Sequence, residues 1–205
     1  MNAPVVVPLD GSGFAEAALQ MARLLASLTG GEIHLVHVTP TATADAFHPD
    51  ERLTVEAHMR NGSAYYLEAR AREMSARDGP VARTAVLDDG GGVAHAVAEY
   101  AESVEAGWIV LTTHGAGGFK RLLAGSVAQE LAKVASTRLL LVRSWDTTVS
   151  LGPGERRIRR ILIAVDGTPE SESALGPARE LAQAFGAWAV LVRVIPPRAD
   201  RKSVV

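Results

Sequence analysis

The segment of the chain best suited to chemistry is a glycine-rich stretch behind a short apolar run. The run ends in Thr112-Thr113-His114-Gly115, further glycines stand at positions 117 and 118, and nine residues separate Gly115 from Gly125-Ser126. Glycine lets the backbone turn freely and approach a ligand closely, so that its N–H groups can form an anion-binding nest. Ser126 is a good helix N-cap, and the first N–H groups of its helix would face the same anion. This arrangement predicts a phosphate site that needs no lysine.

The same glycines also fit a plain connection between a strand and a helix, in which Ser126 only caps its own helix. The stretch is not a Walker A loop, because it lacks Gly-Lys-Ser/Thr. It does not complete the dinucleotide fingerprint either, since Lys120 stands where the third glycine is needed after Gly115 and Gly117. The glycines alone therefore leave the phosphate site and the plain connection both open.

Polar side chains near the glycines allow more than one role. His114 has the chemistry of a general base, but a hydrogen bond that fixes the loop is the favoured interpretation. Lys120 and Arg121 fit phosphate contact and a solvated loop face equally well. His34 and His37 form too weak a pattern for a metal site. We therefore expect no catalytic residue and no protein-ligated metal, and at most slow hydrolysis of a phosphate compound bound at this site.

Apolar runs alternate with helical patterns along the first 143 residues. Strands are expected at 5–9, 33–38, 81–87, 108–112 and 139–142, and helices at 14–28, 51–76, 93–103 and 126–134. The long helix has a possible weak point at Asn61-Gly62. Such alternation predicts right-handed βαβ crossovers and a parallel sheet, and the continuously apolar strands predict helices on both of its faces.

The chain repeats part of itself after a shift of 156 residues. Asp166-Gly167-Thr168 corresponds to Asp10-Gly11-Ser12, and Gly186 corresponds to Gly30. Further matches at the same shift are Glu172 with Glu16, Leu175 with Leu19, Arg179 with Arg23, Val192 with Val36, Val194 with Val38 and Pro196 with Pro40. An ungapped series of this length indicates an internal duplication.

The duplication predicts a domain at 1–146, a linker at 147–156 and a partial second repeat at 157–205, built as strand, helix and strand. The second copy has no counterpart of residues 41–146 and no glycine loop, so it should not hold a triphosphate alone. A two-stranded fragment buries little surface, and it must pack on the first domain or on a partner.

Composition excludes several classes of protein. A net charge of −2 argues against a general binder of nucleic acid or membrane surfaces, which would need a basic excess. The absence of cysteine excludes disulfides and thiolate chemistry. With neither a signal-like start nor an apolar run of membrane-spanning length, a cytoplasmic protein is expected.

Taken together, the motifs resemble those of the universal stress protein family. The family pattern is G-x-x-G followed, after nine further residues, by G-S or G-T. In this chain, Thr112-x-x-Gly115 and Gly125-Ser126 stand at these positions. The first-strand ending Pro8-Leu9-Asp10-Gly11-Ser12 and the second-strand ending Leu35-Val36-His37-Val38 match as well. The resemblance covers residues 4–143 in full and 158–196 as a half copy. It implies a doubly wound five-stranded parallel sheet of order 3-2-1-4-5, the adenine nucleotide alpha hydrolase-like fold.

The resemblance also implies which residues bind a nucleotide. Adenine would lie near Val38, Asp10 would meet the adenosine part, and Gly115, Gly125, Ser126 and Val127 would hold the triphosphate. The full set implied is Pro8, Leu9, Asp10, Ser12, Val38, Leu111, Thr112, His114, Gly115, Gly118, Gly125, Ser126 and Val127. Mg²⁺ or Mn²⁺ would arrive with the triphosphate. Thr112 departs from the family's first glycine, and its side chain would either narrow the pocket or contact ribose or phosphate through its hydroxyl. Asp10 also fits a role as a turn-former only.

The function implied is that of an ATP-binding stress-response protein acting as a nucleotide-dependent switch. A homodimer is expected through the edge strand at 138–143, since exposed edges invite pairing. A nucleotide-free dimerising adaptor is the main alternative. An adenylate-forming or pyrophosphatase-type enzyme is disfavoured because the glycine loop follows the fourth strand instead of the first. Cyclic AMP or AMP as the ligand stays open.

Overall fold

The structure is a computed structural model that describes residues 2–40, 49–76, 78–113, 126–143 and 158–194. The chain divides into two compact units, Met1–Leu151 and Gly152–Val205, and each is described here by itself. The predicted linker at 147–156 lies outside the described residues, so the finer domain boundaries stay a prediction.

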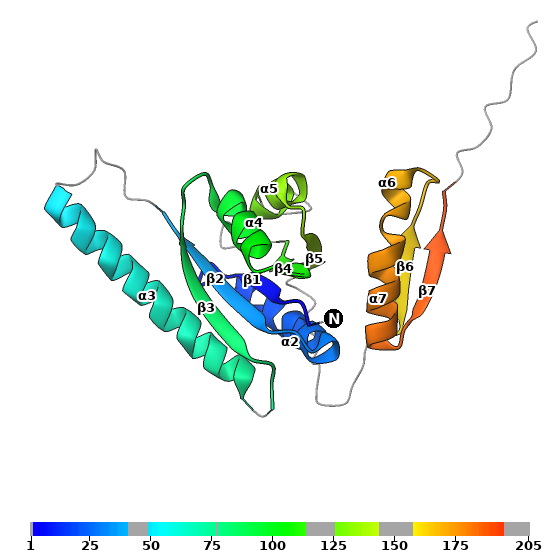
Figure 1. The fold of residues 1–205 in the computed structure, drawn as a ribbon, viewed down its shortest axis with the longest axis horizontal. Helices are drawn as coiled ribbons and strands as arrows, with labels where there is room; N and C mark the ends of the chain where they lie inside the picture. Colours follow the sequence, from blue (N-terminus) through cyan, green and yellow to red (C-terminus); the bar gives the residue numbers. More distant parts are fainter. Residues whose placement is uncertain (1, 41–48, 77, 114–125, 144–157, 195–205) are drawn as a thin grey trace, which may run out of the picture. The chain divides into compact units, whose positions relative to one another are not determined.

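The first unit is built on a five-stranded parallel sheet. Its strands are β1 (Val5–Pro8), β2 (Ile33–Thr39), β3 (Ala82–Asp88), β4 (Trp108–Thr112) and β5 (Arg138–Val142). They are arranged in the order β3-β2-β1-β4-β5, and every neighbouring pair is parallel (Figure 1). The expected order 3-2-1-4-5 is therefore confirmed.

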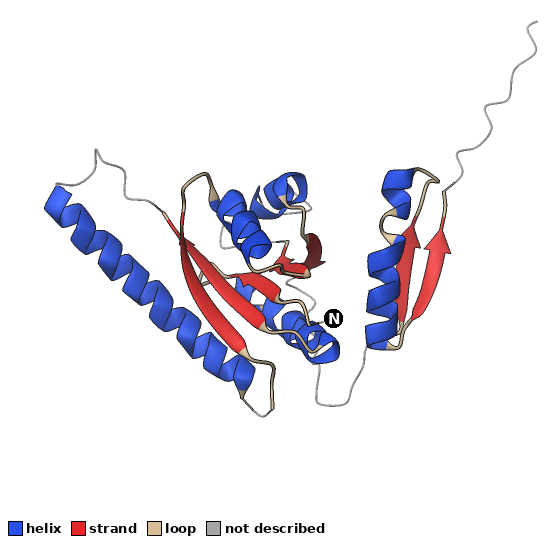
Figure 2. Cartoon of the chain, in the orientation of Figure 1, coloured by secondary structure: helices blue, strands red, loops and turns tan. Residues whose placement is uncertain are grey.

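Helices cover both faces of this sheet (Figure 2). They are α1 (Gly13–Glu16), α2 (Ala18–Thr29), α3 (Pro49–Ser75), α4 (Val93–Ser103) and α5 (Ser126–Val134). A hydrogen bond of 2.8 Å from Arg23 Nη2 of α2 to the carbonyl of Ala76 fixes the end of α3 beside α2 on one face. The helices α4 and α5 contact each other on the opposite face. Two covered faces explain why Val5, Val6 and Val7 of β1 are all fully buried.

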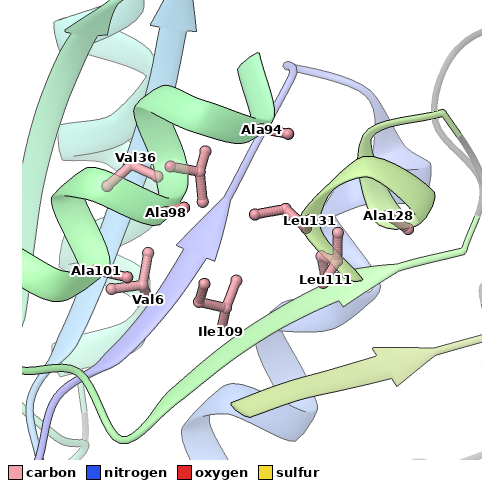
Figure 3. Packing of buried hydrophobic residues seen from close by; sticks show 10 residues of the cluster. Val6, Val36, Ala94, Ala98, Ala101, Ile109, Leu111, Ala128 and Leu131 are labelled. Atoms are coloured by element: carbon pink, nitrogen blue, oxygen red, sulfur yellow. The ribbon is translucent and has the colours of Figure 1, made fainter. Parts of the chain in front are cut away.

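A core of aliphatic side chains joins the sheet to α4 and α5 (Figure 3). The sheet supplies Val6, Val36, Ile109 and Leu111, and α5 supplies Ala128 and Leu131. The helix α4 contributes Ala94, Val97, Ala98 and Ala101, which recur with helical spacing. Because three of these four side chains are single methyl groups, the backbone of α4 can approach the sheet closely.

Two expectations about helices need correction. The single helix expected at 14–28 is broken at Ala17, whose N–H donates to the carbonyl of Phe14 at 3.2 Å in a tightened turn, so that α1 and α2 are separate helices. The expected weak point at Asn61-Gly62 does not interrupt α3, which is continuous from Pro49 to Ser75. Tertiary contacts along α3 outweigh the low helix propensity of one glycine.

The second unit has a two-stranded parallel sheet with one main helix. Its elements are β6 (Arg160–Ala164), α6 (Pro169–Glu172), α7 (Leu175–Phe185) and β7 (Trp188–Val192). Its backbone repeats that of the first unit. Gly11 and Gly167 have φ of 82° and 93°, and the helix-ending Gly30 and Gly186 have φ of 72° and 62°. The internal duplication is thus visible in the left-handed positions that favour glycine.

A buried histidine lies near the amino end of β2. His34 is only 7% exposed, and its Nδ1 lies 3.0 Å from the Tyr100 hydroxyl of α4. Its Nε2 lies 3.6 Å from Glu32 Oε2. A neutral ring with the proton on Nε2 satisfies both contacts. Burial lowers the pKa of His34 below its usual value, and this effect outweighs the opposing influence of Glu32.

The lowered pKa of His34 predicts a loss of stability in weak acid. The unfolded chain takes up the proton first as the pH falls below the ordinary histidine pKa of about 6.5, so folding stability is present above that pH and declines below it. We expect the urea midpoint, followed by circular dichroism, to fall between about pH 7.5 and about pH 5.5. The decrease should be smaller in His34→Gln and unchanged in His58→Gln, a control on the exposed face of α3. Equal decreases in all three proteins would contradict this assignment.

Candidate functional site

The order of the strands places two predicted motifs at one edge of the sheet. The strand β1 pairs with β2 on one side and with β4 on the other. Asp10 follows the end of β1 and Thr113 follows the end of β4. Both strands are parallel, so their carboxyl ends share one edge, at the point where the chain reverses its direction across the sheet. Open α/β sheets bind their ligands at this position.

A tight turn follows β1 and starts α1. Asp10 Oδ1 accepts hydrogen bonds from the Ser12 N–H at 2.9 Å and from the Ser12 hydroxyl at 2.6 Å. Ser12 Oγ in turn accepts from the N–H of Ala15 at 3.2 Å and caps α1. Gly11 adopts φ of 82°, which allows the chain to reverse between the two side chains.

The second unit repeats this turn although its sequence lacks the glycine loop. Asp166 Oδ1 accepts from the Thr168 N–H at 2.9 Å and from the Thr168 hydroxyl at 2.7 Å. Thr168 Oγ1 accepts from the Ser171 N–H at 3.2 Å and caps α6. These hydrogen bonds lower the pKa of Asp166 to about 2, led by the Thr168 hydroxyl. The geometry of the Asp10 turn is therefore sufficient for a structural role, and nucleotide contact by Asp10 stays a prediction.

The ends of β1 and β2 are held together beside this turn. The Leu9 N–H donates to the carbonyl of Val36 at 2.8 Å, and the Leu9 carbonyl accepts from Nδ1 of His37 at 2.8 Å. Because the carbonyl can only accept, the proton of His37 lies on Nδ1. Pro8 pairs with Val36, and the partly buried Val38 packs against the core. The main chain of Leu9 is thus fixed by β2, and its side chain is buried.

The predicted contacts in β4 lie on opposite faces of the sheet. Leu111 is 5% exposed and belongs to the core shared with α4 and α5, so its side chain is committed to packing. Thr112 is the next residue and points to the other face, where α1 contacts β4. The Thr113 N–H donates to the carbonyl of Val142 at 3.0 Å and continues the pairing of β4 with β5.

The helix α5 begins at Ser126, as expected for the helix at 126–134. The role of Ser126 as the N-cap stays a prediction, because the preceding residue lies outside the described part of the chain. Ser126 is exposed, and Val127 packs partly against the core. Both belong to the first turn, whose N–H groups have no partner within the helix itself. Four predicted site residues lie outside the described part of the chain: His114, Gly115, Gly118 and Gly125.

A polar cluster behind the Asp10 turn escaped sequence analysis. Glu16 of α1 accepts a hydrogen bond of 2.9 Å from the Tyr66 hydroxyl of α3, and its other oxygen lies 3.5 Å from Nη1 of Arg70. Burial raises the pKa of Tyr66, and the charges of Glu16 and Asp10 raise it further. Tyr66 and Arg70 are one helical turn apart on α3, but that spacing alone does not reveal that they meet α1.

The loop between β3 and α4 lies beside the end of β2. The Asp89 N–H donates to the carbonyl of Thr39 at 3.1 Å, and Asp89 Oδ1 accepts from the Gly92 N–H at 2.7 Å. Gly92 has φ of 101° at the start of α4, a conformation that favours glycine. Gly92 therefore forms the turn into this helix.

No group of three histidine, aspartate or glutamate side chains in the described part of the chain could hold a metal ion. None of the helices described is long and apolar enough to cross a membrane.

The fold and the placement of these residues define a doubly wound α/β protein with its candidate site at the switch point of the sheet. The sequence model of the universal stress protein family matches residues 1–143 and 157–205. The chain therefore belongs to the universal stress protein family, and the family suggested by its motifs is confirmed.

Individual relatives agree with this assignment. Universal stress protein MJ0531 of Methanocaldococcus jannaschii is 25% identical over 139 residues, which cover 68% of this chain and 81% of the relative. Universal stress protein YxiE of Bacillus subtilis is 26% identical over 147 residues, covering 68% and 97%.

Solved structures share the fold at lower identity. A universal stress protein from Archaeoglobus fulgidus DSM 4304 is 17% identical with a TM-score of 0.69, and the match covers 95% of this chain and 68% of that one. Hypothetical protein MJ0577 is 22% identical with a TM-score of 0.61, covering 70% and 96%. The first of these matches extends over the fold of both units.

The turn after β1 can be tested with two neighbouring glycines. A Cβ at Gly11 or at Gly13 would meet no atom within 4 Å, but only Gly11 has a positive φ. We expect Gly11→Ala to lower the free energy of unfolding by about 1–2 kcal/mol through strain in the left-handed conformation. Gly13→Ala, within α1, should be neutral or stabilise by about 0.5–1 kcal/mol. Urea unfolding measures both, and equal effects would contradict the turn geometry.

Proposed function

We propose that the first unit binds an adenine nucleotide, ATP accompanied by Mg²⁺ or Mn²⁺, and that this makes the protein a nucleotide-dependent switch in the response to stress. The proposal rests on one feature of the topology. The helix α5 ends just before β5 starts at Arg138, which pairs with Trp108 at the amino end of β4. The first turn of α5 therefore points back to the edge where β1 and β4 end.

This arrangement brings different chemistry to one edge of the sheet. The N–H groups of the first turn of α5, from Ser126 onward, offer donors and the positive end of the helix dipole to a phosphate. The Asp10 turn and Val38 lie at the ends of β1 and β2, where the adenosine part would fit. The charge of a triphosphate requires neutralisation, and a divalent cation bound to the phosphates would supply it.

Family members provide a precedent for the class of ligand. One universal stress protein has been solved in complex with cAMP and another, from Archaeoglobus fulgidus, in complex with dAMP. These two structures state what those proteins bind. In this chain, the residues that support nucleotide binding are those of the first turn of α5 and the glycines that precede it in the sequence.

The proposed role is binding and switching, with hydrolysis at most slow. The histidines placed near the sheet are already engaged. His37 donates to the Leu9 carbonyl, and His34 is buried between Tyr100 and Glu32 at the other end of the strand. Neither position suits a general base for water attack on a phosphate at the carboxyl edge.

Binding can be tested by changing the Gly-Ser dipeptide at positions 125–126 and, as a control, the same dipeptide at positions 62–63. We expect Gly125→Val with Ser126→Ala to weaken ATP–Mg²⁺ binding by about 10- to 100-fold, because hydrogen bonds to a charged group contribute about 1.5–3 kcal/mol each. Gly62→Val with Ser63→Ala on α3 is the matched control and should bind like the wild type. Isothermal titration calorimetry and thermal shift measure both double variants.

The identity of the ligand can be established in the same preparation. Mass spectrometry of small molecules released on denaturation should detect an adenine nucleotide, and competition among ATP, AMP and cyclic AMP should rank ATP first. Absence of any released nucleotide together with no thermal shift in millimolar ATP and Mg²⁺ would exclude the proposal and favour the nucleotide-free adaptor.

We further propose that the protein forms a homodimer through β5. This strand pairs only with β4 among the described strands of its sheet, and Leu141 on it is 43% exposed. Two such edges can pair across a twofold axis, which satisfies their backbone groups and buries Leu141.

Light scattering coupled to size exclusion tests the dimer. The wild type should show the mass of two chains, and Leu141→Arg should show the mass of one, because a desolvated arginine is costly at the centre of such an edge. A wild type that is monomeric at every concentration would exclude this dimer and leave nucleotide binding untouched.

A further inference from the structure

Among the described residues, the sheet of the second unit has one apolar face that no helix covers. Side chains alternate along a strand, and Ile163 and Leu191 point toward α7 and line a pocket with Leu175 and Ala182 of that helix. The opposite face carries Leu162 and its partner Val190, with Trp188 and Val192 to either side. Leu162 is 69% exposed and Trp188 is 77% exposed.

The duplication identifies the same face in the first unit. At the shift of 156 residues, Leu162 corresponds to Val6 and Val192 corresponds to Val36. Both valines are fully buried in the core formed with α4 and α5 (Figure 3). In the first unit this face is therefore covered by helices, with α4 lying over β2.

The second copy is more apolar on this face than the first. Val190 replaces the buried His34, and Trp188 replaces Glu32 at the amino end of the strand. Within the described part of the second unit, α6 is one turn long and α7 occupies the opposite face. An exposed patch of large apolar side chains marks a surface for contact.

We propose that this face docks one amphipathic helix of a partner protein, whose seam of small aliphatic side chains resembles that of α4. The face is wide enough for one helix, because two strands about 4.8 Å apart form a strip about 10 Å wide, close to the diameter of a helix. The seam of α4, formed by Ala94, Val97, Ala98 and Ala101, shows which side chains suit the pleated surface. The docked helix runs antiparallel to β6 and β7, as α4 does to β2.

The direction of the docked helix follows from contacts and charge. In the first unit, Tyr100 in the second half of α4 meets His34 near the amino end of β2. In the second unit, Arg160 lies at the amino end of β6, on the uncovered face beside Trp188. The carboxyl end of a helix carries negative partial charge, so this arginine favours a helix that ends there with an acidic residue, as α4 does with Glu102.

The test uses the full chain and a synthetic peptide with the sequence of residues 91–106. A hydrocarbon staple through positions 95 and 99, both exposed on α4, holds the peptide helical. Fluorescence anisotropy of the labelled peptide should show saturable binding, and the indole N–H resonance of Trp188 should shift while that of the buried Trp108 does not. Leu162→Arg should weaken binding by about tenfold or more, through lost apolar contact and a desolvated charge.

The controls distinguish this surface from others. Leu53→Arg on α3 replaces a leucine that is 68% exposed, nearly the same fraction as Leu162, and should leave binding unchanged. A stapled peptide carrying Val97→Glu should not bind. No binding up to about 1 mM peptide, or equal binding by the Leu162→Arg variant, overturns the proposal. A dimer of the full chain that Leu162→Arg dissociates would also overturn it, because a second copy would then cover the face.

Discussion

The structure depends on the burial of β1 on both of its faces. Three consecutive valines, Val5 to Val7, exclude solvent completely, and a parallel strand can do so only between two layers of helices. Within the sheet, β1 pairs with β2 on one side and with β4 on the other. Because all three strands are parallel, their carboxyl ends lie at one edge. The candidate site is a consequence, because the chain must leave β1 and β4 at the same place.

The second unit acts as an internal comparison for the first. It keeps the Asp-Gly-Ser/Thr turn, the helix and the left-handed glycines, but its sequence has no glycine loop. Features shared by both copies belong to the strand-turn-helix unit itself, so the capping turn at Asp10 does not depend on a ligand. Features confined to the first copy, above all the stretch from Gly115 to Ser126, are the ones that nucleotide binding can explain.

Local pattern and family resemblance predicted the strands and their order, because each apolar run is continuous and each turn carries glycine or proline. They did not predict the break at Ala17, which arises where a one-turn helix capped by Ser12 meets a second helix with its own axis. They also missed the contacts of Glu16 with Tyr66 and Arg70, which join residues about 50 positions apart. Such contacts depend on how α3 crosses the sheet, and no local spacing encodes that.

The two copies differ on the face of the second sheet that the described helices of that unit leave uncovered. In the first copy, this face carries the buried His34 and the partly exposed Glu32. In the second copy, the corresponding positions hold Trp188 and Val190, beside the exposed Leu162. Large exposed apolar side chains next to open strand edges promote aggregation unless something covers them. Contact with the proposed helix would cover them, as α4 and α5 cover Val6 and Val36 in the first unit.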